Sequence, residues 1–159
     1  MKQIQSAQSF GVRAVVIIAV AAAVIGCAGK GKNNDMNQLD RLSGCSGPPN
    51  CVSSESEDPR HSVDPMQLLG DSNNEWLAIQ DVVDRLPRSR IVKATDRYLH
   101  VTLKSKVLGF IDDLELMLDP QTEMISIRSA ARSGYFDLGV NRRRVEKLRK
   151  QLQAAELIR

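Results

Sequence analysis

Alternating apolar residues between positions 90 and 129 constrain the fold more than any other feature of this chain. Successive side chains of a strand point to opposite faces of a sheet, so an apolar residue at every second position predicts a strand with one apolar face. Val92 and Ala94, for example, share a face of the first predicted strand. The pattern predicts four strands joined by short connections, an antiparallel meander, at residues 90–95, 98–104, 110–119 and 122–129.

The apolar face of this meander needs a cover, and a helix is predicted on each side of it in the chain. Ser72 and Glu75 have the spacing of a capping box for the first helix, which ends before Pro87. Asn141 is the predicted N-cap of the second. The sequence therefore predicts an α+β domain over residues 72–159, a four-stranded antiparallel meander with a helix before and a helix after packed on one face.

Turn lengths predict the register of the strands. With loops at residues 96–97, 105–108 and 120–121, one polar row crosses the face opposite the leucines, in the order Lys93, His100, Asp113, Arg128. Opposite charges paired across strands contribute ~0.2–1 kcal/mol each. The row is either a solvated ladder of ion pairs or a recognition face on which His100, oriented by Asp113, titrates near neutral pH.

Asp112 lies on the predicted inward face, because neighbours on a strand point to opposite faces and Asp113 belongs to the outward row. These two carboxylates therefore cannot share a proton as a catalytic pair. An unpaired charge inside a core is too costly, so Asp112 needs a partner, and an arginine further along the chain is the natural one. The alternative is a bulge near Gly109 that turns Asp112 outward.

A run from Arg128 to Arg149 carries six arginines, three of them in the first turn of the second predicted helix. The helix dipole prefers negative charge at that end, and Asp137 and Asp112 are the acids best placed to compensate. Helix N-terminal amides and arginine side chains also suit phosphate or carboxylate groups. The run is therefore interpreted first as a structural cluster and second as an anion or partner site, whose candidate residues are Arg128, Arg132, Tyr135, Asp137, Asn141, Arg142 and Arg144.

The first residues of the chain predict a bacterial lipoprotein. Lys2 and Arg13 precede an uncharged apolar stretch that is too short to span a bilayer and is typical of a signal peptide. The four residues ending at Cys27 resemble a lipobox, which implies cleavage after residue 26, acylation of Cys27 and anchoring in the membrane. A short uncleaved anchor is the alternative. Ala28 stands where an aspartate would favour the inner membrane, so we expect the outer membrane, facing the periplasm.

Residues 27–44 form a predicted tether, because few are apolar and no period is present. Residues 45–71 follow as a disulfide loop and an extended segment. Cys45 and Cys51 are predicted to pair, because export places them in an oxidising compartment; free thiols are the alternative. A closed zinc site needs four ligands, and His61 is the only histidine nearby.

Composition and charge exclude some classes of function. The chain has 159 residues, of which 22 are lysine or arginine and 19 aspartate or glutamate. Two of the basic residues lie in the predicted leader, so the remaining charge is nearly balanced, which argues against a nucleic-acid partner. No metal-ligand cluster, phosphate-binding glycine loop or nucleophile elbow is present, so no cofactor and no metal are predicted.

Three segments resemble the DUF1499 family of bacterial envelope proteins and chloroplast relatives: CSGPPNCVSSE, GFIDDLELMLD and RSAARSGYFDLGVNRRRVEKLR. The resemblance covers about Leu42 to Arg149 and implies a shared fold without an established activity. The matching positions in the last segment are Arg128, Ser129, Arg132, Gly134, Tyr135, Asp137, Gly139, Asn141, Arg142, Arg144 and Glu146.

Two functions from different classes follow. The favoured one is a non-enzymatic envelope module, anchored in the membrane by acyl chains, that binds a partner protein or an anionic ligand through the arginine run. The other is a small hydrolase or transferase that uses His100 with Asp113, or Ser129 as a nucleophile. No catalytic residue is assigned in the favoured reading.

Overall fold

The computed structural model of the protein describes residues 41–106 and 109–159. The predicted signal peptide, Cys27 and most of the predicted tether lie outside these residues. The description below therefore concerns the last four residues of the predicted tether, 41–44, and the part of the chain that follows it.

The described residues form six strands and two helices: β1 (Cys51–Ser53), β2 (Met66–Gln67), α1 (Ser72–Asp84), β3 (Ser89–Ala94), β4 (Tyr98–Lys104), β5 (Ile111–Asp119), β6 (Met124–Ala131) and α2 (Val140–Ala154). The strands make one antiparallel sheet in the order β1-β6-β5-β4-β3, and β2 pairs with β6 on the same side as β1. The α+β class and the meander from β3 to β6 are confirmed. The expected number of four strands is wrong, because β1 and β2 add two strands that pair with the outer edge of β6. Without them this edge would be open for pairing with another chain.

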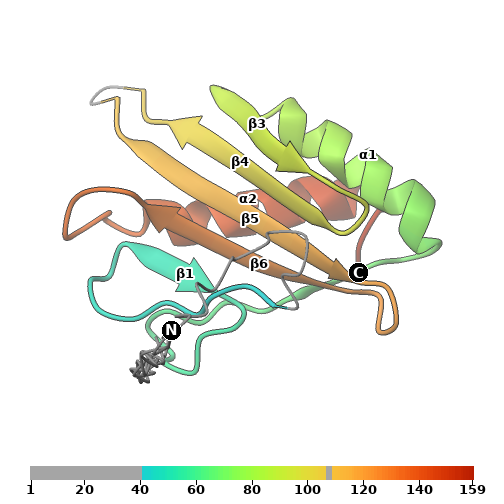
Figure 1. Cartoon of the computed structure of the whole chain (residues 1–159), viewed down its shortest axis with the longest axis horizontal. Helices are drawn as coiled ribbons and strands as arrows, with labels where there is room; N and C mark the ends of the chain where they lie inside the picture. Colours follow the sequence, from blue (N-terminus) through green and yellow to red (C-terminus); the bar gives the residue numbers. More distant parts are fainter. Residues whose placement is uncertain (1–40, 107–108) are drawn as a thin grey trace, which may run out of the picture. The chain divides into compact units, whose positions relative to one another are not determined.

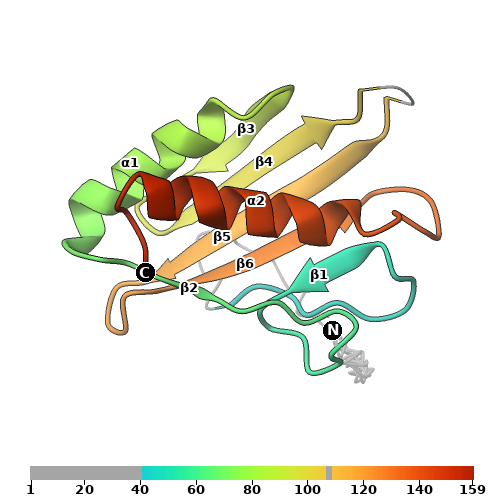
Figure 2. The ribbon, with the colours of Figure 1, turned by 180° about the vertical axis from the view of Figure 1, so that it is seen from behind.

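Both helices lie on the same face of the sheet, α2 over β5 and β6 and α1 beside β3 (Figures 1 and 2). The apolar stripes of the helices meet the inward residues of the strands in one core, whose fully buried members include Trp76, Ile79, Leu114, Leu116 and Leu148. The indole of Trp76 also donates a hydrogen bond of 2.9 Å to the carbonyl oxygen of Thr95. The helices therefore supply the cover that the alternating strands require.

The polar row on the open face has a different register from the predicted one. Lys93 faces His100 as predicted. His100, however, faces Glu115, and Glu115 faces Arg128. The prediction that Asp113 stands in this row is wrong, and Glu115 takes its place.

Longer connections explain the shift. The connection from β4 to β5 occupies residues 105–110, and the turn from β5 to β6 occupies residues 120–123, so each is two residues longer than predicted. The carboxylate of Asp119 accepts hydrogen bonds from two residues of the second turn. A shift of two residues keeps each side chain on its face. Asp112 therefore remains inward and Asp113 outward, as the alternation predicted.

Strand β3 contains an irregularity that the alternation did not predict. Its pairing with β4 shifts between Ile91 and Lys93. A bulge of this kind exchanges the faces of a strand. Val92, which was expected to face inward with Ala94, is 53% exposed, and Ile91 packs against the core instead.

Both helices begin at caps other than the predicted ones. Asp71 is the N-cap of α1, and its carboxylate accepts a hydrogen bond of 3.0 Å from the amide of Asn73. Ser72 is already the first helical residue, so the predicted serine cap is wrong. Gly139 is the N-cap of α2, and Asn141, the predicted cap, is buried in the first turn.

The predicted disulfide between Cys45 and Cys51 is present, with the two Cα atoms 5.7 Å apart. Cys51 is the first residue of β1 and faces Ala130 of β6. The buried ring of His61 donates from Nδ1 to the carbonyl oxygen of Cys51 at 2.8 Å. The disulfide and this hydrogen bond together fix the start of β1 at the edge of the sheet.

Candidate functional site

An arginine of α2 meets the inward carboxylate of β5 at one end of the sheet. Arg144 donates from Nη2 to the carboxylate of Asp112, and only 15% and 9% of these side chains are exposed. The prediction that a later arginine neutralises Asp112 is confirmed. The alternative, a bulge that turns Asp112 outward, is wrong, because Asp112 faces Leu103 in the regular ladder between β4 and β5.

Two buried polar side chains complete this pair. Arg144 also donates to Ser129 Oγ at 2.8 Å and to the side-chain oxygen of Asn141. The hydroxyl of Ser129 donates to the same oxygen at 2.7 Å, and the amide nitrogen of Asn141 donates to the carbonyl oxygen of Asn50 at 2.8 Å. Ser129 and Asn141 are fully buried. These contacts join β5, β6, α2 and the segment before β1 in one network.

Asp137 supplies the negative charge that the first turn of α2 requires. Its carboxylate accepts hydrogen bonds from the backbone amides of Gly139 at 2.8 Å and Asn141 at 2.9 Å, and from the side-chain amide of Asn141 at 2.8 Å. A carboxylate at this end of a helix interacts favourably with the helix dipole and stabilises the helix. Asp137 thus occupies the amides that would otherwise attract an anionic ligand.

Two further arginines of α2 donate to backbone carbonyl groups of the connection between β1 and β2. Arg142 donates to the carbonyl oxygens of Ser62 at 2.8 Å and Arg60 at 3.0 Å. Arg149 binds the next residues of the same segment, donating to the carbonyl oxygens of Asp64 and Pro65. These two arginines hold the connection between β1 and β2 against α2, so their role in the fold is structural.

On the open face, Glu115 replaces Asp113 as the centre of the polar row. It accepts hydrogen bonds from Arg128 at 2.6 Å and from the hydroxyl group of Tyr98 at 2.8 Å. Burial and the bond to Glu115 raise the pKa of Tyr98 above its ordinary value. Lys93 lies over the ring of Tyr98, with its Nζ 6.0 Å from the ring centroid. The sequence placed Glu115 beside Tyr98, but the predicted register put Asp113 opposite Arg128, so the pair between Glu115 and Arg128 was missed.

Asp113 still contacts His100, although the two do not face each other across the strands. Nε2 of His100 lies 2.7 Å from the carboxylate of Asp113, and Arg132 donates two further hydrogen bonds of 2.9 and 2.8 Å to it. Burial alone raises the pKa of Asp113, but the hydrogen bonds from Arg132 and His100 outweigh it and lower the pKa below its usual value. The predicted orientation of His100 by Asp113 is therefore present as a diagonal contact.

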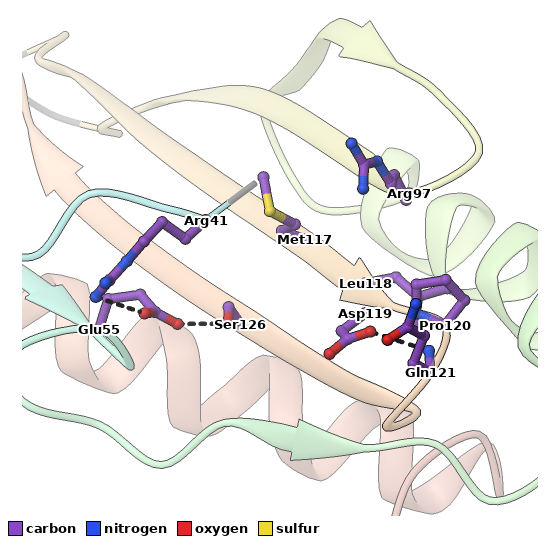
Figure 3. A pocket seen from close by; sticks show the side chains of 9 residues that line it. All are labelled: Arg41, Glu55, Arg97, Met117, Leu118, Asp119, Pro120, Gln121 and Ser126. Atoms are coloured by element: carbon purple, nitrogen blue, oxygen red, sulfur yellow. Dashed lines mark hydrogen bonds and ion pairs between the residues drawn. The ribbon is translucent and has the colours of Figure 1, made fainter. Parts of the chain in front are cut away.

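A hollow of about 520 Å³ lies on the open face near the turn between β5 and β6 (Figure 3). Arg41 pairs there with Glu55 at 3.2 Å, and Glu55 accepts a hydrogen bond of 2.6 Å from Ser126 (Figure 3). The next residue, Leu42, is buried against Tyr98 and Met117. The segment before the disulfide thus covers part of the open face and pairs the charge of Glu55.

The loop between β6 and α2 presents apolar side chains to solvent. Tyr135, Phe136 and Leu138 are 73%, 65% and 74% exposed. Tyr135 belongs to the predicted binding residues, whereas Phe136 and Leu138 were missed. The signal was present in the sequence, because large apolar residues in a loop between glycines have no period that assigns them to a core.

This apolar loop lies at the same end of the sheet as the connection from β4 to β5 (Figure 1). A hollow of about 330 Å³ between the two is lined by apolar side chains, among them Phe110, Phe136 and Val140. Within the described residues no group of three or more histidine, cysteine or acidic side chains is placed to hold a metal ion. Neither described helix has the length and hydrophobicity needed to cross a membrane.

The fold and the site define an α+β module in which an arginine-rich loop and helix close one end of an antiparallel sheet. The family model described as "Protein of unknown function (DUF1499)" matches residues 41–152, and the chain belongs to this family. The resemblance found in the sequence is thereby confirmed. No match is found among curated proteins or among solved structures.

Loss of Arg144 should destabilise the protein strongly. Removing one member of a buried ion pair leaves the other charge uncompensated, so we expect Arg144→Ala to lower the free energy of unfolding by ~3–5 kcal/mol. Arg143→Ala is the matched control, because Arg143 is exposed and, among the described residues, donates only to the carbonyl oxygen of Leu138. We expect it to cost about 1 kcal/mol. Denaturant unfolding measures both values, and equal losses would contradict the importance of the pair.

The contribution of the Asp113–Arg132 pair should depend on pH. A carboxyl group whose pKa is lowered by folding stabilises the fold above its unfolded pKa, and this contribution is lost as the pH falls through the folded pKa. The stability difference between wild type and Arg132→Gln should therefore be complete at neutral pH and shrink below pH ~4.

A titration of the Asp113 carboxyl group by nuclear magnetic resonance tests the cause directly. In Arg132→Gln, the pKa of Asp113 should rise, because the main hydrogen bonds that lower it are lost. An unchanged pKa would show that Arg132 does not hold this carboxylate in solution.

Proposed function

We propose that this protein is a non-enzymatic binding module of the bacterial cell envelope. Acyl chains on Cys27 anchor it in the outer membrane, so that the module faces the periplasm and binds an anionic ligand or a partner protein. The lipobox-like residues ending at Cys27 support the anchor. The observation that carries the binding role is the loop between β6 and α2, which exposes three large apolar side chains while Asp137 binds backbone amides of the same chain.

The arginine run belongs to the framework of this module. Arg128, Arg132, Arg142 and Arg144 all donate to carboxylates or carbonyl oxygens of the same chain. Of the residues predicted to bind a ligand, Tyr135 is 73% exposed, whereas the half-exposed side chain of Arg132 is paired with Asp113. The binding role is therefore assigned to the loop that the arginines support.

The geometry of the loop also favours a binding role. Leu138 has a φ of 54°, a conformation that costs a non-glycine residue about 1–3 kcal/mol. Two hydrogen bonds hold this residue in place. Asp137 accepts one from the amide of Gly139, and Arg143 donates one to the carbonyl oxygen of Leu138. The backbone held in this way presents a leucine that is 74% exposed.

The alternative, a small hydrolase or transferase, has weaker support. The hydroxyl group of Ser129 is buried under α2 and donates to Asn141, whereas His100 stands on the open face of the sheet. A serine nucleophile needs a base within hydrogen-bonding reach. The contact between His100 and Asp113 is therefore the one observation that still supports an enzymatic function.

A photocrosslinking amino acid placed in living bacteria tests the proposal. We expect crosslinks to envelope components from position 135, because this side chain is exposed on the binding loop. Position 77 is the matched control, since Leu77 is 64% exposed on α1. Equal or absent crosslinking at the two positions would contradict a binding role for the loop.

The anchor is tested in the same strain. Mass spectrometry of the membrane-extracted protein should find acyl chains on the residue at position 27 of the wild type, and Cys27→Ser should abolish them. A wild-type protein without acyl chains on Cys27 would refute the anchoring part of the proposal.

A further inference from the structure

We propose that the loop between β6 and α2, with the neighbouring start of β5, docks on an anionic phospholipid bilayer. Its apolar side chains enter the interfacial region while nearby lysines contact lipid headgroups. This inference rests on the proposed binding role of the loop and names its ligand. We call this surface the docking tip, and its apolar residues are Phe110, Ile111, Tyr135, Phe136, Leu138 and Val140.

Four of the six apolar residues of the docking tip lie around one hollow. Phe110, Phe136, Leu138 and Val140 line the same hollow, although they come from two separate parts of the chain. All the apolar residues of the tip are at least 40% exposed. Soluble proteins rarely expose a continuous apolar surface that has no binding role. The tip thus has the composition of a surface that is covered during function.

The charge around the docking tip is positive. Lys106 lines the same hollow as Phe136. Arg143 and Lys147 line a neighbouring hollow of about 270 Å³ together with Val140. Within the described part of the chain, neither lysine forms an ion pair. An apolar centre with a basic border complements the anionic surface of a bilayer.

The acidic groups of this region do not cancel that charge. Asp112 is buried against Arg144, and Asp137 is engaged by the first amides of α2. Of the acids nearby, Asp58 is paired with Arg60 and Glu146 with Arg149. The carboxylates are thus held by internal cations or amides, whereas the lysines point to solvent.

The position of the docking tip fits a bilayer better than a protein groove. The loop projects past the end of β6, beside the connection from β4 to β5 (Figure 1). Tyrosine and other aromatic side chains favour the interface between lipid and water. A projecting apolar loop can enter this interface without a partner of complementary shape, so a lipid surface is the simplest ligand.

The test measures how deeply single side chains of the full-length, membrane-extracted protein enter a bilayer. Phe136→Trp places a fluorescent indole on the docking tip, and Leu77→Trp places one on α1 as the matched control. The native Trp76 is buried in the core and contributes the same background to both. The proteins are reconstituted into vesicles of brominated phosphatidylcholine with or without phosphatidylglycerol.

In vesicles that contain phosphatidylglycerol, we expect a blue shift and several-fold stronger quenching of the indole in Phe136→Trp than in Leu77→Trp. The quenching of Phe136→Trp should fall in vesicles of pure phosphatidylcholine. It should also fall in a variant that combines Phe136→Trp with Lys106→Gln and Lys147→Gln. Lys150→Gln, which removes one positive charge from a later turn of α2, should leave it unchanged.

Equal quenching at positions 136 and 77 would overturn the inference, as would quenching that does not depend on phosphatidylglycerol. Crosslinks from position 135 to a protein, combined with no quenching at position 136, would leave the proposed binding role intact and refute the lipid ligand. The failure of the two proposals can therefore be distinguished.

Discussion

The inward carboxylate of Asp112 sets the arrangement of this end of the molecule. A carboxylate on the covered face of a sheet is shielded from water. It therefore needs a cationic partner that is buried with it. Arg144 supplies that cation from α2, and its other hydrogen bonds reach Ser129 and Asn141. The start of α2 is therefore tied to β5 and β6, and the loop that joins β6 to α2 must close over a short path. Leu138, within this loop, has a φ of 54°.

This arrangement separates two kinds of side chain that are neighbours in the sequence. The arginines donate to groups of the same chain: Arg128 and Arg132 bind carboxylates on the open face, and arginines of α2 connect this helix with the sheet and with the segment between β1 and β2. The apolar residues of the same loop turn outward, next to lysines without internal partners among the described residues. An arginine-rich sequence therefore does not by itself indicate an anion site. The polar network is the support, and the surface that it supports is apolar with a basic border.

The alternation of side chains predicted the faces of Asp112 and Asp113, because it depends only on local backbone geometry. The predicted register was wrong by two residues. It depends on the lengths of two connections, and the alternation of apolar residues does not show where a turn begins or ends. Strands β1 and β2 were missed because they have only three and two residues, too few to show an alternating pattern. They form strands because they pair with β6. The exposed position of Phe136 was missed because its hydrophobicity suggests burial, although the absence of a period in this segment left it unassigned to the core.

A double-mutant cycle between positions 112 and 144 tests the central claim most directly. Asp112→Leu and Arg144→Met replace each charge by an apolar side chain, singly and together. If the buried pair governs this end of the fold, each single variant leaves one uncompensated charge, and the double variant unfolds with a smaller loss than the sum of the two. Losses that simply add would contradict the claim that these two residues act as one unit.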